Sequence, residues 1–349
     1  MKLLEKTITM IGDLDKETME KSRERIDNLI KPAKSLGKLE NIAAQLSGIT
    51  KNIHPIVNKK TLIVMAADHG VYEEGVSEFS QDITATQAIN MIKGLTGVCA
   101  LAKVSSAEVV VVDLGVKDDF EEDSGILVKK IRYGTNNMTK GPAMTREEAI
   151  KAMEIGIETA NEEIKKGANI LGTGEVGITN TTASTAILAV LGNLDPKDIT
   201  GRGSGLSKEG IENKAKVIQR AIDVNQPNAD DAIDVVSKVG GLEIAGMAGV
   251  ILSAAANRVP VVIDGYISTV AALLAVKLQP KTREYIIPSH ASLETGAKKA
   301  SELLGVDPII HADLCLGEGS GAVLAFPIIE AACDMINIMP TFAEAGIIL

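Results

Sequence analysis

Two glutamates stand alone inside glycine-rich segments of this sequence, Glu175 in Gly174–Gly177 and Glu318 in Gly317–Gly321. Each segment follows a short apolar stretch and leads into a helical pattern of small residues. Glycine lets backbone N–H groups approach a ligand closely, and the start of a helix attracts anions. A carboxylate held beside such a site can act as a general base. The pattern predicts a site that binds an anionic ligand and keeps a carboxylate base next to it.

Glu318 allows two interpretations that its neighbours do not separate. Apolar residues such as Leu316 raise the pKa of a carboxyl group toward useful basicity, while nearby backbone N–H groups lower it. Alternatively, Glu318 is a helix-start glutamate that complements the helix dipole. On the residues alone, both interpretations remain open.

The segment around Glu175 continues into a run of hydrogen-bonding side chains. Gly174–Thr182 contains two glycines and four hydroxyl or amide side chains. Such N–H and O–H donors suit a phosphate group or ribose hydroxyls. A capped helix start is the alternative, because threonine and asparagine are favoured caps. We favour the ligand-binding interpretation for this segment.

A second glycine-rich segment, Gly201–Gly205, is similar to part of a dinucleotide-binding fingerprint. No strand pattern precedes it, so a Rossmann-type dinucleotide site is poorly supported. Lys214 follows on a helical pattern that also carries Lys208 and Lys216. Most lysines on such a face are solvated, but one of these could reach an anion held by the glycine-rich segments. The sequence contains no P-loop motif.

Polar residues follow several predicted strands, among them Asp68-His69, Asp264 and His290. Ligands of open α/β sheets bind outside the carboxyl ends of the strands, so we expect these residues along one active-site edge. Their spacing does not match a metal-ligand motif, and no metal is expected. A lone histidine is more often a structural hydrogen-bonding residue. No nucleophile elbow is present, so nucleophilic hydrolysis has little support.

Short β-rich runs alternate with helical patterns from residue 61 onward. Continuous apolar strands with intervening helices indicate a parallel sheet buried on both faces. We therefore expect a doubly wound, three-layer α/β/α fold with a mainly parallel sheet of about six strands. The expected strands are Thr61–Met65, Val109–Val112, Asn169–Leu171, Val259–Ile263, Tyr285–Ile287 and Ile309–His311, and the expected helices include Thr86–Lys103, Arg146–Lys166 and Lys208–Asn225.

Residues 13–49 have a helical pattern without strands, and Asp15 is the expected cap of its first helix. Lys31-Pro32 interrupts this pattern, because the residue before proline avoids the α region. An apolar helix with Pro327 near its start is expected close to the C-terminus. We predict a small helical domain from residues 1–58 and 322–349 and a large α/β catalytic domain from residues 59–321.

The chain has 349 residues, 45% of them hydrophobic, and a formal net charge of −10. This composition is typical of a globular protein with a large core, and the negative charge argues against nucleic-acid binding. The 3 cysteines have no ligand spacing and are expected as buried free thiols. The N-terminus lacks a secretory signal, and the apolar run Ala248–Ala256 is too short to cross a bilayer. We expect a soluble cytoplasmic protein without membrane contact.

Between residues 32 and 321, a series of these segments in this order resembles one family, the nicotinate-nucleotide–dimethylbenzimidazole phosphoribosyltransferases. Each match alone is weak, but together and in register they are specific. The matching segments are Pro32–Glu40, Ala66–Val71, Glu74–Ser77, Gly134–Asn137, Gly174–Thr182, Gly201–Leu206 with Lys214, Val239–Glu243, Asp264-Gly265, Ser289-His290 and Leu316–Gly321.

The resemblance implies transfer of phosphoribose from nicotinate mononucleotide to a benzimidazole-type base, with release of nicotinate, in the assembly of the cobalamin nucleotide loop. It implies that Glu318 is the catalytic base and Glu175 a second active-site carboxylate. It implies a homodimer, with neither a metal nor a cofactor. The residues that would bind phosphate and ribose are Gly177, Asn180, Thr181, Gly203, Ser204, Gly205, Lys214 and Gly317, and those of the base pocket are Ser80, Thr86, Gln87 and Leu316.

The sequence departs from the family pattern at two positions. Ungapped alignment places Thr86 where the family often has a glutamine near the base pocket, and Gln87 is its neighbour. Another acceptor, such as adenine, a substituted benzimidazole or a phenol, is therefore an alternative. Thr179 stands where the family usually has glycine, which should narrow the phosphate loop slightly. A non-catalytic nucleotide-binding paralog is a further alternative, although Glu175, Lys214 and Glu318 are all present.

Overall fold

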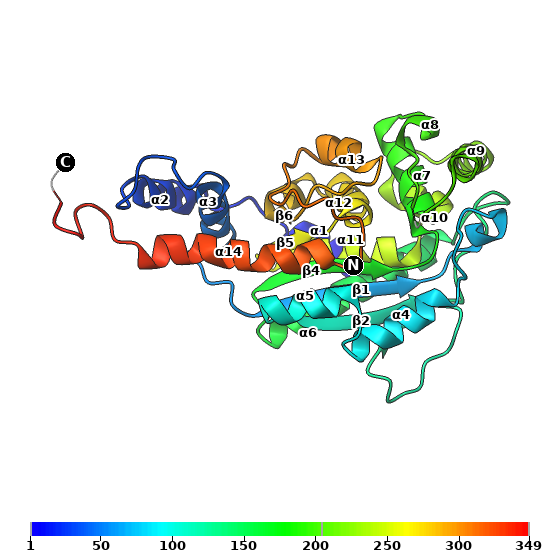
Figure 1. The fold of residues 1–349 in the computed structure, drawn as a ribbon, viewed down its shortest axis with the longest axis horizontal. Coiled ribbons are helices and arrows are strands. Elements are labelled where there is room, and N and C mark those ends of the chain that lie inside the picture. The colour runs from blue at the N-terminus through cyan, green and yellow to red at the C-terminus, as the bar shows by residue number, and fades with distance from the viewer. Residues whose placement is uncertain (1, 204, 348–349) are drawn as a thin grey trace.

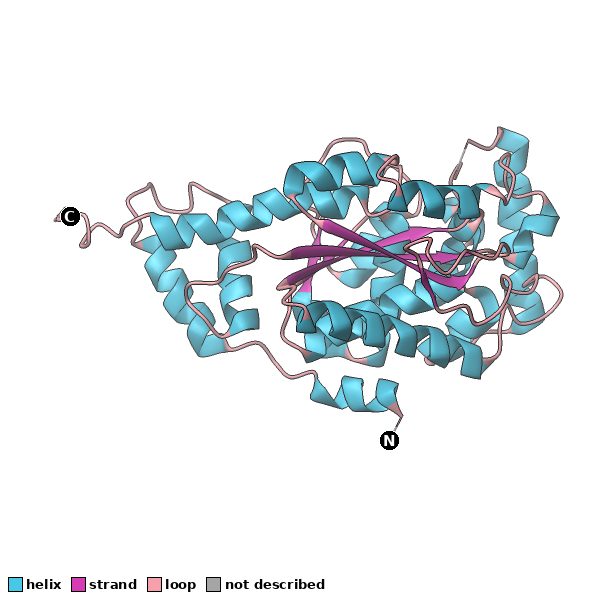
Figure 2. Ribbon diagram, turned by 90° about the horizontal axis from the view of Figure 1, so that it is seen from below, coloured by secondary structure: helices cyan, strands magenta, loops and turns pink. Residues whose placement is uncertain are grey.

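The computed structural model describes residues 2–203 and 205–347. Within these residues a six-stranded sheet has the order β3-β2-β1-β4-β5-β6, and each pair of neighbouring strands is parallel. Helices cover both faces of this sheet, as Figure 2 shows. The expected three-layer α/β/α fold is confirmed. The strands are β1 (Lys60–Ala67), β2 (Glu108–Gly115), β3 (Leu127–Val128), β4 (Ile170–Val176), β5 (Val261–Ile263) and β6 (Ile286–Pro288).

Five of the six strand predictions are confirmed, and one is wrong. Ile309–His311 forms only a single bridge, in which Ile310 pairs with His290. The sixth strand is the short β3, whose Leu127 and Val128 pair with the end of β2. So short an edge strand leaves almost no periodic signal in the sequence, since period-2 patterning needs about four residues or more.

The helices differ from the predicted patterns mainly where glycine interrupts them. The expected helix Thr86–Lys103 is two helices, because the chain turns at Gly94, which has a φ of +73°. The helices are α1 (Leu3–Met10), α2 (Lys16–Asp27), α3 (Lys38–Thr50), α4 (Ile83–Ile92), α5 (Gly97–Ser105), α6 (Arg146–Lys165), α7 (Asn180–Gly192), α8 (Pro196–Ile199), α9 (Lys208–Asn225), α10 (Ala232–Val239), α11 (Leu242–Ala256), α12 (Tyr266–Leu278), α13 (Ala297–Leu304) and α14 (Ser320–Ile338).

The alternation of side chains along β1 divides the core between the two faces of the sheet. Ile63, Met65 and Ala67 belong to one buried cluster, and Leu62 and Val64 to the other. Helices α6, α11 and α12 enclose the first cluster, while α4, α5 and α14 cover the second. Since both faces are buried, β1 is apolar throughout, as expected for a central parallel strand.

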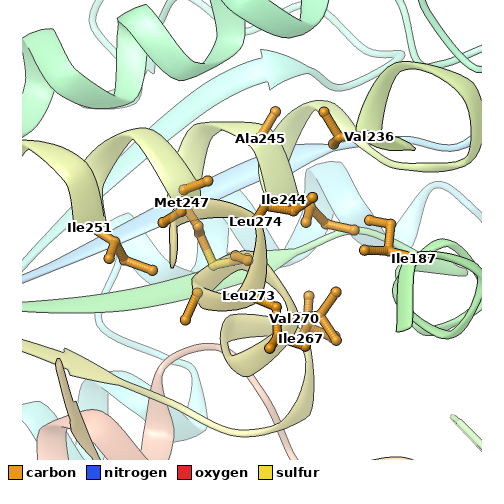
Figure 3. Packing of buried hydrophobic residues seen from close by; sticks show 14 of the residues in the cluster. Ile187, Val236, Ile244, Ala245, Met247, Ile251, Ile267, Val270, Leu273 and Leu274 are labelled. Atoms are coloured by element: carbon orange, nitrogen blue, oxygen red, sulfur yellow. The ribbon is translucent and has the colours of Figure 1, made fainter. Parts of the chain in front are cut away.

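Helices α11 and α12 form the centre of the larger core cluster, where Met247, Ile251 and Leu274 lie close together (Figure 3). Helix α11 also crosses α6 at very short range. A Cβ at Gly156 would lie 2.0 Å from the carbonyl oxygen of Gly246, and one at Gly249 would lie 2.0 Å from that of Met153. Glycine is therefore required at both crossings, and the backbones of the two helices touch.

Helices α2 and α3 pack on each other and on α14, away from the sheet (Figure 1). Asp15 caps α2 as predicted, since its side chain accepts a hydrogen bond from the backbone N–H of Thr18 at 2.9 Å. Leu29 forms a bridge with Thr341, which ties this helical unit to the C-terminal segment. Helix α1, in contrast, packs on α11 and α6 of the α/β body.

Helix α14 is the one helix within residues 2–203 and 205–347 that is long and apolar enough to cross a membrane. It packs along the sheet against β4 and β5 and against α3 and α5, and 56% of its apolar window is buried. A core helix meets the same length and hydropathy criteria, and this packing accounts for its composition. Its N-terminus lies at the carboxyl ends of the strands, where the functional residues collect.

The order of the strands predicts where a ligand binds. The chain runs from β1 outward to β2 and β3, and then returns to place β4 on the other side of β1. In open α/β sheets the crevice at such a reversal, outside the carboxyl ends of the strands, is the usual binding site.

Candidate active site

A cavity of about 400 Å³ opens at the carboxyl ends of β4 and β5. Polar groups dominate the end near α7, and apolar side chains dominate the end near α4. The lining includes Val76, Phe79, Ile83, Gln87, Glu175, Gly177, Ile178, Thr179, Asn180, Thr181, Gly203, Asp264, Tyr266, His290, Ser292, Glu294, Cys315, Leu316, Gly317 and Glu318.

Glu318 lines this cavity from the turn that precedes α14. Its Oε1 accepts a hydrogen bond from Nε2 of Gln87 at 3.0 Å, and its Oε2 accepts one from the backbone N–H of Val98 at 3.2 Å. Burial raises the pKa of Glu318 despite these two donors, and the charge of Asp264 raises it further. Each carboxylate oxygen retains a lone pair, so the group can still accept a proton from a ligand.

The backbone of Glu318 is held in a sparsely populated conformation. Its φ is +64°, and Gly317 and Gly319 on either side also have positive φ values, +82° and +94°. A non-glycine residue in the left-handed region stores strain that the surrounding structure must offset. At Gly317 a Cβ would lie 2.5 Å from Oε1 of Glu175. The tight turn therefore explains the glycines around Glu318.

Glu175 is the penultimate residue of strand β4, lies next to this turn and is buried, with 6% of its surface exposed. Burial raises its pKa to about 8, and the charge of Asp264 adds to this effect. Its oxygens accept hydrogen bonds from the side chain of Asn180 and, at 3.4 Å, from the backbone N–H of Glu318. Near neutral pH, Glu175 is therefore mostly a neutral acid.

Asp264 follows β5 and holds the start of α14 in place. Its carboxylate accepts hydrogen bonds from the backbone N–H groups of Gly319 at 3.0 Å, Gly321 at 2.6 Å and Ala322 at 3.3 Å. Nδ1 of His290 lies 3.6 Å from Oδ1 of Asp264. An anion at a helix N-terminus is stabilised by the N–H groups and by the dipole. Asp264 thus fixes the turn that carries Glu318.

Thr181 and Gly203, one from each glycine-rich segment, line the polar end of the cavity, and Lys214 lies against both of them without lining the cavity itself. Lys214 is 1% exposed, and its ammonium donates a hydrogen bond to Oγ1 of Thr181 at 2.7 Å. A Cβ at Gly203 would lie 3.0 Å from that hydroxyl oxygen and 3.1 Å from Nζ of Lys214. Burial lowers the pKa of Lys214 to about 8. A buried ammonium beside helix-start N–H groups can bind an anion such as phosphate.

The other predicted phosphate residues take different positions. Gly177 and Asn180 line the cavity, and Gly317 lies beside Glu175. Gly205 has a φ of +115°, is exposed, and does not line the cavity. Ser204 lies outside the described residues.

Thr179 adopts a left-handed conformation at the start of α7, with a φ of +77° and a ψ of 5°. This geometry explains why glycine suits the position and why a β-branched residue is strained there. Its hydroxyl is buried without a hydrogen-bond partner among the described residues.

Four residues were predicted for the base pocket, and the structure brings two of them into the cavity. Gln87 donates to Glu318, and Leu316 lines the same end. Thr86 is exposed, and its hydroxyl donates to the carbonyl oxygen of Asp82, because its helical position turns it away from the cavity. Ser80 is exposed and lines a separate, smaller cavity.

The four predicted strand-end residues divide in the same way. Asp264 and His290 line the main cavity, whereas Asp68 lines the smaller one. His69 is buried and its Nε2 forms a 2.8 Å hydrogen bond with Glu243. Burial alone lowers the pKa of His69, but the carboxylate of Glu243 outweighs it and raises the pKa. His69 fits the structural interpretation given to a lone histidine.

Several lining residues were missed from the sequence. Tyr266 follows Asp264-Gly265 directly, and Glu294 lies four residues after His290, so extending each strand-end motif would have included them. The backbone N–H of Val98 carries no sequence signal at all. The expectation for the cysteines is wrong for Cys315, which is exposed and lines the cavity, because the turn before α14 runs along the protein surface.

No group of three or more His, Cys, Asp or Glu residues that could hold a metal ion occurs among residues 2–203 and 205–347.

Residues 11–347 match a family model described as "Phosphoribosyltransferase". A nicotinate-nucleotide–dimethylbenzimidazole phosphoribosyltransferase of Alkaliphilus metalliredigens (strain QYMF) is 69% identical over 99% of both chains. A protein of the same name from Clostridioides difficile (strain 630) is 52% identical over 99% of both chains. The crystal structure of CobT from Thermus thermophilus superimposes with a TM-score of 0.92 at 38% identity, covering 95% of this chain and 99% of that one. The chain therefore belongs to the nicotinate-nucleotide–dimethylbenzimidazole phosphoribosyltransferase family and is a phosphoribosyltransferase.

Proposed function

We propose that this enzyme transfers phosphoribose from nicotinate mononucleotide to a benzimidazole-type base, giving an α-ribazole 5′-phosphate and nicotinate. The relatives carry this activity in their names. The observation that supports it most directly is that the carboxylate of Glu318, bonded to Gln87, lines the same cavity as the apolar side chains suited to an aromatic base and the Thr181 hydroxyl that Lys214 contacts. This transfer would serve the assembly of the cobalamin nucleotide loop.

Glu318 is the proposed general base. One imidazole nitrogen of the acceptor attacks the anomeric carbon, and the ring N–H on the other nitrogen then becomes acidic. The carboxylate of Glu318 accepts this proton, and its raised pKa makes it a better base than an exposed glutamate. The N–H groups of Gln87 and Val98 keep the two oxygens pointing in a fixed direction.

The leaving group requires no acid catalyst. Nicotinate mononucleotide already carries a positive charge on its pyridinium nitrogen, which departs as a neutral pyridine when the bond to the anomeric carbon breaks. Attack from the opposite face converts a β-nucleotide into an α-nucleotide. Because no pyrophosphate is released, this chemistry does not call for a metal ion bound to a diphosphate.

Lys214, Thr181, Asn180 and the Gly177 and Gly203 turns are the proposed phosphate and ribose site. Glu175 lies between this site and Glu318. Its neutral state near pH 7 limits the negative charge that a bound phosphate must face, which supports its role as a second active-site carboxyl group.

The acceptor is tested with a panel of bases. Purified protein is incubated with nicotinate mononucleotide and, separately, with dimethylbenzimidazole, adenine or a phenol, and the products are followed by mass spectrometry. We expect transfer to dimethylbenzimidazole, because Gln87 is hydrogen-bonded to Glu318 despite its shift by one position from Thr86. Transfer to adenine or a phenol alone would replace the proposed acceptor, and no transfer at all would refute the proposal.

We further propose that the enzyme works in the cytoplasm as a homodimer. Exposed apolar side chains on and after α4, including Ile89, Ile92 and Leu95, support an interface on that side. Light scattering after size-exclusion chromatography tests the dimer, and a monomer at micromolar concentration would contradict it.

We also propose that α2, α3 and the C-terminal part of α14 form a separate small domain, whereas residues 1–10 belong with the α/β domain because α1 packs on α11.

A further inference from the structure

The loop between β6 and α13 brings one carboxylate, Glu294, to the polar end of the cavity. Glu294 lines this end together with Thr181 and Gly203, and its side chain is only partly buried. The transfer mechanism above gives it no task. A carboxylate in this place repels a bound phosphate and lowers its affinity.

Glu294 and Lys214 contact the same short turn. A Cβ at Gly201 would lie 2.5 Å from Oε2 of Glu294, and a Cβ at Gly203 would lie 3.1 Å from Nζ of Lys214. Gly201 and Gly203 are separated by a single residue, so the two opposite charges lie against the same short turn. Within the described residues, neither side chain has an ion-pair partner closer than 4.0 Å.

Lys214 is a buried cation with little direct compensation. Its ammonium has three donor hydrogens and donates a hydrogen bond to the neutral hydroxyl of Thr181. Burial lowers the pKa of Lys214, and the charge of Glu294 works against that effect. A buried ammonium needs a nearby anion, and a phosphate supplies one only while the nucleotide is bound.

We propose that Glu294 is the counter-charge of Lys214 in the empty enzyme and that the phosphate of the nucleotide competes with it. This inference rests on the proposed function, because it takes the polar end of the cavity as the phosphate site. The product of the transfer keeps its 5′-phosphate, so the phosphate group must dissociate from its site once in every turnover. A nearby carboxylate that weakens phosphate binding favours that release.

Glu294→Gln tests the inference, because glutamine keeps the shape of the side chain and removes its charge. We expect the Kd of nicotinate mononucleotide and of inorganic phosphate, measured by titration calorimetry at fixed ionic strength, to fall about threefold to tenfold. Nicotinate riboside, which lacks the phosphate, should bind the variant and the wild type equally.

Glu212→Gln is the matched control. Glu212 precedes Lys214 by two residues on α9 but is exposed and lies outside the cavity lining. Solvent screens its charge, so this variant should change the Kd of phosphate by less than about 1.5-fold. Thermal unfolding of both variants establishes that each is folded.

Weaker phosphate binding by Glu294→Gln would overturn the inference, because it would make Glu294 a partner of the ligand. An unchanged Kd, or equal effects of the two variants, would overturn it as well. Failure of the proposed function has a different signature: nicotinate mononucleotide would bind but no acceptor would be modified, and the comparison of phosphate Kd values would still hold.

Discussion

The turns that carry Glu175 and Glu318 have nearly the same local sequence, yet they place their carboxyl groups in different environments. Glu175 lies near the end of strand β4, accepts hydrogen bonds from Asn180 and from the backbone of Glu318, and has its pKa raised to about 8. Glu318 begins a helix in a left-handed conformation and faces the cavity with two hydrogen-bond donors on its oxygens. The glycines make both placements possible, but the backbone around each glutamate decides which one can serve as a base.

The comparison is tested most severely at Glu318. Replacing it by glutamine in the variant Glu318→Gln removes the proton acceptor and keeps the size of the side chain, so kcat should fall about 10²- to 10⁴-fold. The KM for nicotinate mononucleotide should change little, since the phosphate end is untouched. Steady-state kinetics with dimethylbenzimidazole measures both constants. A variant that keeps most of the wild-type kcat would show that another group accepts the proton.

Substitution of Lys214 should change KM, whereas substitution of Glu318 should change kcat. In Lys214→Met the phosphate loses a charge-assisted hydrogen bond worth about 1.5–3 kcal/mol, so the KM for nicotinate mononucleotide should rise about 10- to 100-fold. The kcat at saturation should stay within a few-fold of wild type. Lys216→Met is the control, because Lys216 lies on the same helix but is exposed. Equal effects of the two substitutions would remove Lys214 from the phosphate site.

Glu175 should tolerate the substitution that Glu318 does not. With a pKa of about 8, Glu175 is mostly protonated at pH 7, and glutamine imitates that neutral form. We expect Glu175→Gln to lower kcat less than about tenfold at pH 7. Wild-type activity should decline as Glu175 ionises above pH 8, and the variant should lack this decline. A loss as large as that of Glu318→Gln would show that Glu175 acts as an ionised group.

The same carboxyl group also affects stability in a definite direction. Its pKa in the folded protein, about 8, lies above the ordinary glutamate value of 4.5. The unfolded chain therefore releases this proton first, and the free energy of unfolding falls as the pH rises from about 4.5 to about 8. Urea denaturation at several pH values should show a smaller fall for Glu175→Gln than for the wild type.

The sequence was sufficient for the parts of the fold that have strong periodicity. The continuous apolar runs of β1 and β2 predicted a parallel sheet, and the helical pattern at Lys208–Asn225 corresponds to α9. The two-residue β3 could not be predicted, because a single pair of apolar residues has no period. The strand predicted at Ile309–His311 is only a single bridge at Ile310, because two adjacent apolar residues occur in loops as well as in strands.

Site residues that belong to a sequence motif could be predicted. Residues whose place in the site depends on which face of a helix points to the cavity could not. Alignment pointed to Thr86, but the rotation of α4 places Gln87 beside Glu318 and turns Thr86 to the surface. The backbone N–H of Val98 belongs to no motif, since any residue at the start of α5 supplies it. Glu294 was missed because the strand-end motif was ended at His290, four residues before it.

Thr179→Gly is the smallest expected effect and concerns the loop that Glu175 leads into. Glycine should relieve about 1–3 kcal/mol of strain at a φ of +77°, and its greater freedom in the unfolded chain should offset about 0.5–1 kcal/mol of that gain. Thr182→Gly is the control, because Thr182 lies inside α7 and is buried, so glycine should destabilise there. Urea denaturation measures both changes. If both variants were destabilised equally, Thr179 would be unstrained, and the left-handed turn before α7 would not explain why glycine suits this position.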